Sequence, residues 1–72
     1  MIAKRSVNIA GHKTSVSLEE EFWDELKTIA QTDGVSLASL IESIDRQRAG
    51  DPGAGNLSSA LRLHVLAHLR AG

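Results

Sequence analysis

Two histidines, His64 and His68, stand four residues apart near the C-terminal end of the sequence. On a helix this spacing places both imidazoles on one face, where they can bind one metal ion. Leu57 and Leu61 share that face, and no carboxylate or cysteine is close to them in sequence. We therefore interpret both histidines as partly buried helix residues, and we expect no metal and no other cofactor.

A third histidine, His12, precedes two serines that could act as nucleophiles, Ser15 and Ser17. A histidine base needs a carboxylate to orient it, and residues 1–18 contain no Asp or Glu. A chain of this size is also too small to form a substrate cleft of ordinary dimensions. The sequence therefore predicts that the protein is not an enzyme.

The stretch from His12 to Leu18 has the alternation of a two-faced strand. One face is apolar and consists of Thr14, Val16 and Leu18. The other face is polar and consists of Lys13, Ser15 and Ser17. The rest of the chain reads as mostly helical, so this strand lacks an obvious partner within it. Since backbone donors and acceptors need partners, we predict that the strand pairs with a second copy of itself.

Composition points to one small domain of 72 residues without cysteine, whose core alone is only marginally stabilising. Dimerisation is a common way to enlarge such a core. The net charge of −1 is not that of a strongly basic nucleic-acid binder, but the charge is unevenly distributed. Residues 1–18 carry Lys4, Arg5 and Lys13 without an acid, and the acidic residues begin at Glu19. No apolar run or signal-peptide pattern indicates a membrane or an export route, so we expect a soluble cytoplasmic protein.

The pattern divides the chain into four segments, 1–12, 13–49, 50–55 and 56–72. The first is an extended arm or an extra strand, and both interpretations remain open. The second contains the strand and two helices, the third is a Gly-rich flexible linker, and the fourth is a C-terminal helix.

Local signals set the expected ends of the helices. Ser17 and Glu20 have the spacing of a capping box, so the first helix should begin near Ser17 or Leu18 and end at Gly34. Ser36 should cap a second helix that runs to about Arg48 or Ala49.

The apolar faces of these elements predict a core shared by two chains. Its expected members are Thr14, Val16, Leu18, Phe22, Trp23, Leu26, Ile29, Leu40, Ile41 and Ile44. The C-terminal helix is apolar almost all round between Leu57 and Leu69. We expect part of this helix to cover the core and the rest to form an assembly surface for another dimer or a protein partner.

The order of a strand, an acidic helix start, an Asp-Gly turn and a Ser-capped helix resembles the ribbon-helix-helix family, which includes β-ribbon DNA readers. The resemblance covers about residues 13–48, and the flanks resemble a short bacterial subfamily of that family. It implies a mainly α protein with one short strand per chain, a third helix, and an intertwined homodimer whose antiparallel ribbon lies in the DNA major groove.

The resemblance also implies roles for particular residues in a DNA-binding transcriptional regulator, such as a repressor. The implied base contacts are Lys13, Ser15 and Ser17, and the implied phosphate contacts are Lys4, Arg5, Ser36 and Leu37. Two of the three ribbon positions are serines, which contact several bases and discriminate poorly. The alternative function is a protein–protein interaction module, either antitoxin-like or an adaptor, built on the same dimer.

Overall fold

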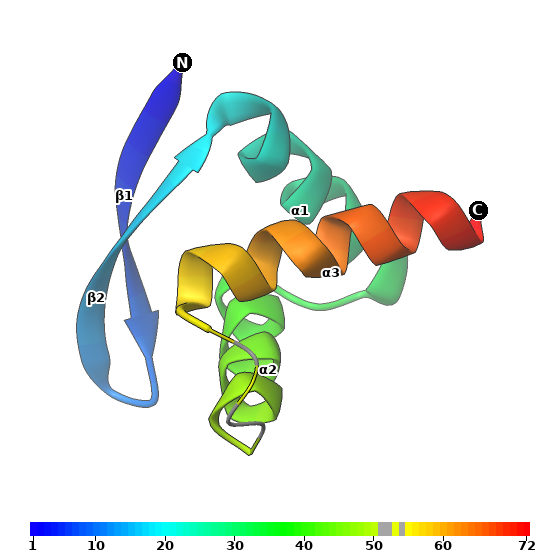
Figure 1. The fold of residues 1–72 in the computed structure, drawn as a ribbon. Coiled ribbons are helices and arrows are strands. Elements are labelled where there is room, and N and C mark those ends of the chain that lie inside the picture. The colour runs from blue at the N-terminus through cyan, green and yellow to red at the C-terminus, as the bar shows by residue number, and fades with distance from the viewer. Residues whose placement is uncertain (51–52, 54) are drawn as a thin grey trace.

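The chain folds as an antiparallel hairpin followed by three helices, and the computed structural model describes residues 1–50, 53 and 55–72. The elements are β1 (Ile2–Ile9), β2 (His12–Glu19), α1 (Glu20–Asp33), α2 (Leu37–Ala49) and α3 (Leu57–Ala71). Figure 1 shows the twisted hairpin at one side of the helices, with α3 lying across α1 and α2. The helices therefore cover one face of the hairpin.

The hairpin depends on a tight turn at Ala10 and Gly11. Their φ angles of 50° and 83° are both positive, as a two-residue type I′ turn requires, and the strands pair from Ile9↔His12 to Ile2↔Glu19. The expectation that the strand has no partner within its own chain, and that each chain has one strand, is therefore wrong. The N-terminal segment is the partner strand, because its alternation matches that of β2 across a turn that Gly11 permits.

The first helix begins later than expected. Pairing with β1 keeps β2 extended as far as Glu19, so α1 starts at Glu20, and the predicted capping box of Ser17 with Glu20 does not form. Glu19 occupies the N-cap position without a side-chain hydrogen bond to the helix. The Glu20 N–H instead donates to the Met1 carbonyl at 3.2 Å, so the residue that precedes β1 supplies a partner for one free helix donor.

The other helix ends follow the sequence signals. Gly34 has the left-handed φ of 69° at the end of α1, and the Val35 N–H donates to the Ala30 carbonyl at 3.0 Å, as in a Schellman motif. Ser36 caps α2, because its Oγ accepts from the Ser39 N–H at 3.0 Å.

The hydrophobic core closes within one chain. Of the ten residues expected in a shared core, eight are buried here, and Thr14 and Phe22 are half-buried. Trp23 is fully buried, and its indole N–H donates to the Ala3 carbonyl of β1 at 2.9 Å. Burial of these side chains therefore does not require a second copy, and the homodimer remains a prediction.

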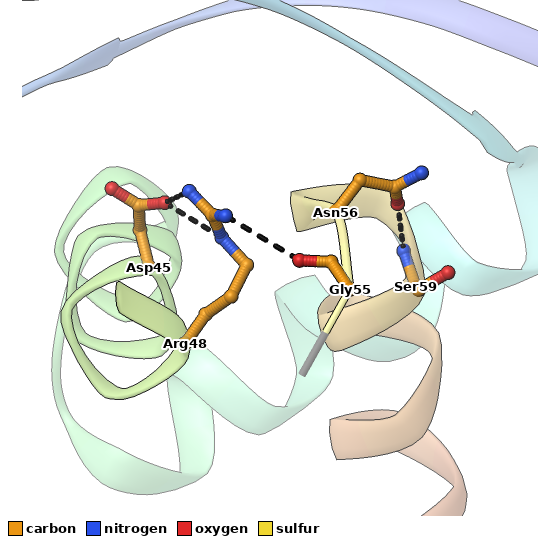
Figure 2. A network of polar contacts seen from close by, with 5 residues as sticks. All are labelled: Asp45, Arg48, Gly55, Asn56 and Ser59. Atoms are coloured by element: carbon orange, nitrogen blue, oxygen red, sulfur yellow. Dashed lines mark hydrogen bonds and ion pairs between the residues drawn. The ribbon is translucent and has the colours of Figure 1, made fainter. Parts of the chain in front are cut away.

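The connection from α2 to α3 is fixed at its two described ends, while residues 51, 52 and 54 of the predicted linker lie outside the described residues. Arg48 donates to the Asp45 carboxylate through Nε at 3.1 Å and to the Gly55 carbonyl at 3.4 Å (Figure 2). Asn56 caps α3, because its Oδ1 accepts from the Ser59 N–H at 2.8 Å. These contacts hold the start of α3 against the end of α2.

α3 has one buried and one exposed side. Leu61 and Val65 are 0% and 1% exposed, so this helix completes the core as expected for part of its surface. Leu63, Leu66 and Leu69 are 58%, 46% and 55% exposed on the other side. No helix within the described part of the chain is long and apolar enough to cross a membrane.

Candidate nucleic-acid interface

The hairpin presents one polar face to solvent, on the side away from the helices. We call this the outer face; it consists of Lys4, Ser6, Asn8, Lys13, Ser15 and Ser17. All are exposed except Ser17, which is half-buried. The alternate positions turn inward, where Val16 and Leu18 are almost completely buried.

The outer-face residues lie opposite one another in three cross-strand pairs. The register gives Lys4↔Ser17, Ser6↔Ser15 and Asn8↔Lys13. In a two-residue hairpin the pair that flanks the turn, Ile9 and His12, is hydrogen-bonded, so these three are non-hydrogen-bonded pairs. Side chains in such pairs are close together, about 4.5 Å apart at their Cα atoms. The outer face is thus one continuous polar strip over two strands.

The electrostatics of this strip are cationic. It carries Lys4 and Lys13 without a carboxylate among its six residues. The acid at the end of β2, Glu19, pairs with Arg62 of α3 through contacts of 3.0 and 3.3 Å. These hydrogen bonds from Arg62, followed by one from the backbone of Glu19, hold the pKa of the Glu19 carboxyl below its ordinary value of 4.5. The carboxylate at the end of β2 is therefore paired within the chain.

Arg5 does not share the face of Lys4, although both were expected to contact phosphate. It points inward, half-buried, with its guanidinium 5.3 Å from the centre of the Trp23 ring. This is the distance of a cation–π contact. The structure thus gives Arg5 a packing role at the core and leaves Lys4 on the outer face.

The start of α2, the other expected phosphate site, lies away from the hairpin turn. The Ala10 N–H of the turn meets the Glu42 carboxylate at 3.4 Å, so the turn lies beside the middle of α2 and not its N-terminus. The Ser36 hydroxyl is engaged in capping, and Leu37 packs against the core. The structure therefore does not bring Ser36 and Leu37 together with Lys13.

Sequence reasoning did not select Ser6 and Asn8, which complete the outer face. The signal was present, because the alternation that turns Val7 and Ile9 inward turns Ser6 and Asn8 outward. What was missing was the strand pairing, which places Asn8 directly opposite Lys13.

The structure gives the surroundings of the histidines on α3. Within residues 1–50, 53 and 55–72, no group of three or more His, Cys, Asp or Glu side chains is placed to hold a metal ion. His64 is half-buried on α3 and His68 is exposed.

A ribbon strand followed by two short-linked helices is the element order of the ribbon-helix-helix family, and this chain belongs to that family. The sequence model of the ribbon-helix-helix domain matches residues 2–69. Members of this family are generally DNA-binding regulators or antitoxins and are typically not enzymes. The predicted family and ribbon-helix-helix fold are thus confirmed, with two strands in each chain instead of one, and the intertwined dimer remains a prediction.

One solved structure is similar over almost the whole chain. It is that of an uncharacterized protein from Bordetella pertussis Tohama I, with a TM-score of 0.79 and 37% sequence identity. The match covers 97% of this chain and 57% of that protein, so the chain spans a little over half of its length. No curated protein matches this chain.

Proposed function

We propose that this protein is a DNA-binding transcriptional regulator, a cytoplasmic bacterial repressor, whose hairpin lies in the major groove with its outer face toward the bases. The observation that carries the proposal is the outer face itself, a polar strip of six residues that includes two lysines and no carboxylate, while Glu19 at the end of β2 is paired with Arg62. The major groove, about 12 Å wide, admits a two-stranded ribbon. The family supports the same function, since its members are generally DNA-binding regulators or antitoxins.

The proposed contacts divide into two groups. Lys13, Ser15 and Ser17 approach base edges, as the resemblance implied, and Lys4 contacts phosphate at the far end of the strip. Arg5 is left out, because leaving the Trp23 ring would cost its packing contact. Backbone N–H groups at Ser36 and Leu37 remain a proposed phosphate contact, since helix N-termini bind anions.

A salt series on outer-face variants tests this function. Binding of a labelled duplex should weaken steeply as salt rises, because each phosphate contact releases counterions. Lys13→Ala should lower the slope of log K against log salt by about one if Lys13 contacts phosphate, and Ser15→Ala and Ser17→Ala should weaken binding with little change of slope. Lys27→Ala, an exposed lysine of α1, is the matched control and should bind as wild type does. Wild-type binding that ignores salt would contradict the proposal.

We also propose a homodimer, joined through the exposed leucines of α3. Ribbon-helix-helix domains typically form dimers, yet the expected shared core is already filled within the chain. Pairing two β2 strands would give a four-stranded sheet about 14 Å across, at about 4.8 Å per spacing, which exceeds the width of the groove. Leu63, Leu66 and Leu69 offer an apolar surface elsewhere that leaves both hairpins free.

Sedimentation of charged variants tests this interface. Leu63→Lys with Leu66→Lys should turn the dimer into a folded monomer, because both side chains are exposed in the single chain. Gln31→Lys, at an exposed position of α1, adds the same kind of charge and should leave the dimer intact. A monomeric wild type would refute the dimer, and a dimer that survives the double substitution would place the interface on the strand edge.

The exposed leucines also support the second candidate function, an interaction module that binds a different protein through α3, as an antitoxin or adaptor would. The two functions differ in the hairpin, because only the DNA-binding function depends on Lys13 and its neighbours. A protein that self-associates through α3 and binds duplex DNA with a steep salt dependence favours the regulator. A monomer without DNA binding favours the module.

A further inference from the structure

We infer that Asn8 is the residue that sets base preference, and that the preference is for adenine at the turn end of the hairpin. This inference rests on the proposed function and names the recognition element within it. It goes beyond the contacts that the resemblance implies, because Asn8 lies on β1 and not on the strand that precedes the first helix.

The first argument is chemical. An asparagine side chain carries a donor and an acceptor in fixed geometry, which match N7 and N6 of adenine at the same time. The other outer-face side chains are serines, which contact several bases, and lysines, whose donors suit the two acceptors of guanine. Asn8 is therefore the side chain of this strip whose geometry suits adenine.

The second argument is that the Asn8 amide is free. Its side chain is exposed and makes no hydrogen bond with any residue that the structure describes. Asn56 shows the contrast, since its Oδ1 is engaged in capping α3. An asparagine with a structural role has its partner within the chain, whereas the hydrogen-bonding capacity of Asn8 faces solvent.

The third argument is position. Asn8 and Lys13 form the last outer-face pair before the Ala10-Gly11 turn, at the end of the ribbon where the backbone reverses. Lys13, paired with Asn8 across the hairpin, adds positive charge at this end of the strip, which attracts a strongly negative duplex. The pair thus combines attraction that is independent of sequence with a side chain that reads sequence.

Selection of bound duplexes from a random pool, with quantitative binding of the enriched and single-base-changed sequences, tests the inference. Wild type should prefer adenine at one position of each bound site by about 5- to 150-fold, the range of a good bidentate pair. Asn8→Ala should bring this ratio close to one while it retains salt-dependent binding. Gln31→Ala removes an exposed amide side chain from α1, outside the outer face, and is the matched control that should keep the preference.

The outcomes separate this inference from the proposed function. If Asn8→Ala enriches the same sequences as wild type, or if wild type binds DNA without an adenine preference, the inference is wrong and the DNA-binding function stands. If wild type shows no salt-dependent binding to any duplex, both are wrong. Circular dichroism of the variants confirms that each remains folded, as substitution at an exposed strand position predicts.

Discussion

The two faces of the hairpin differ in burial and in polarity, although their residues alternate along each strand. The inner face carries Val16 and Leu18, which are 2% and 0% exposed against the helices. The outer face carries serine, asparagine and lysine side chains that make no hydrogen bond with the residues that the structure describes. All of them are exposed except Ser17, which is half-buried. The inner face therefore determines whether the chain folds, and the outer face is free to determine what the folded chain binds.

α3 repeats this division with the opposite chemistry. Its inward side completes the core, and its exposed residues include three leucines beside His68 and Arg70, whereas the outer face of the hairpin is polar throughout. The same fold thus presents two exposed surfaces of different character, one that suits a nucleic acid and one that suits a protein. Substitutions at neighbouring inward and outward positions should separate folding from binding in both elements.

The largest difference is expected between Val16→Asp and Ser15→Asp. Val16→Asp buries an unpaired carboxylate in a small core and should cost about 4 kcal/mol or more, enough to unfold a marginally stable domain. Ser15→Asp places the same charge in solvent one residue away, so the protein should fold and lose duplex binding by repulsion from phosphate. Circular dichroism and a binding titration measure the two effects. A folded Val16→Asp variant would refute the described core.

The next comparison is between Leu61 and Leu63 on α3. Leu61→Ala should destabilise the protein by about 2–5 kcal/mol through loss of buried surface and a residual cavity. Leu63→Ala should change the free energy of unfolding by less than about 0.5 kcal/mol. Urea denaturation at a protein concentration below that of self-association makes the comparison. Equal effects would mean that α3 does not cover the core as described.

For the same reason truncation after Ala49 should unfold the chain. Removal of Leu61 and Val65 would expose the side of the core that α3 covers.

A smaller difference should separate Arg5 from Lys4. Arg5→Ala removes the cation–π contact with Trp23 and should lower stability by about 0.5–1 kcal/mol. Lys4→Ala should leave stability unchanged and reduce the salt slope of DNA binding by about one if Lys4 contacts phosphate. Thermal melts and salt-dependent titrations of both variants measure the two effects. A Lys4→Ala variant that loses stability, with an Arg5→Ala variant that does not, would contradict these roles.

The smallest effect is expected from the pair of Glu19 and Arg62. Since the folded pKa of Glu19 lies below its ordinary value of 4.5, the stabilising contribution of its charge is complete above about pH 4.5. It is lost as the pH falls through the lower folded pKa. Glu19→Gln should therefore be slightly less stable than wild type at pH 7, and the gap should close in acid. A difference in stability between wild type and Glu19→Gln that widens in acid would contradict the lowered pKa of Glu19.

Much of this fold could be predicted from local signals. Gly34, Ser36 and Asn56 mark helix ends by their own conformational and capping preferences, which do not depend on distant residues. The start of α1 could not be predicted in this way. Ser17 is a good helix cap by type, but its pairing opposite Lys4 keeps it in a strand. The strand conformation of Ser17 depends on its pairing with Lys4, 13 positions earlier in the sequence, and a local pattern does not contain this information.

The candidate site was predicted only in part, because part of it also depends on pairing between residues that are distant in sequence. Alternation placed Lys13, Ser15 and Ser17 on one face, and the structure confirms that they share it. Lys4 and Arg5 are neighbours in sequence, so a charge count groups them, whereas strand geometry sends them to opposite faces. Asn8 was overlooked because its importance depends on its partner across the hairpin, Lys13.

The central claim is that the outer face of the hairpin is the surface that contacts DNA. Amide and side-chain NMR shifts of the protein, followed as a short duplex is added at low salt, test it most directly. The account predicts that the perturbed residues cluster on Lys4, Ser6, Asn8, Lys13, Ser15 and Ser17, including the Asn8 side-chain NH2, while Leu63, Leu66 and Leu69 stay unchanged. Perturbations centred on α3, or none on the hairpin at any duplex concentration, would contradict it.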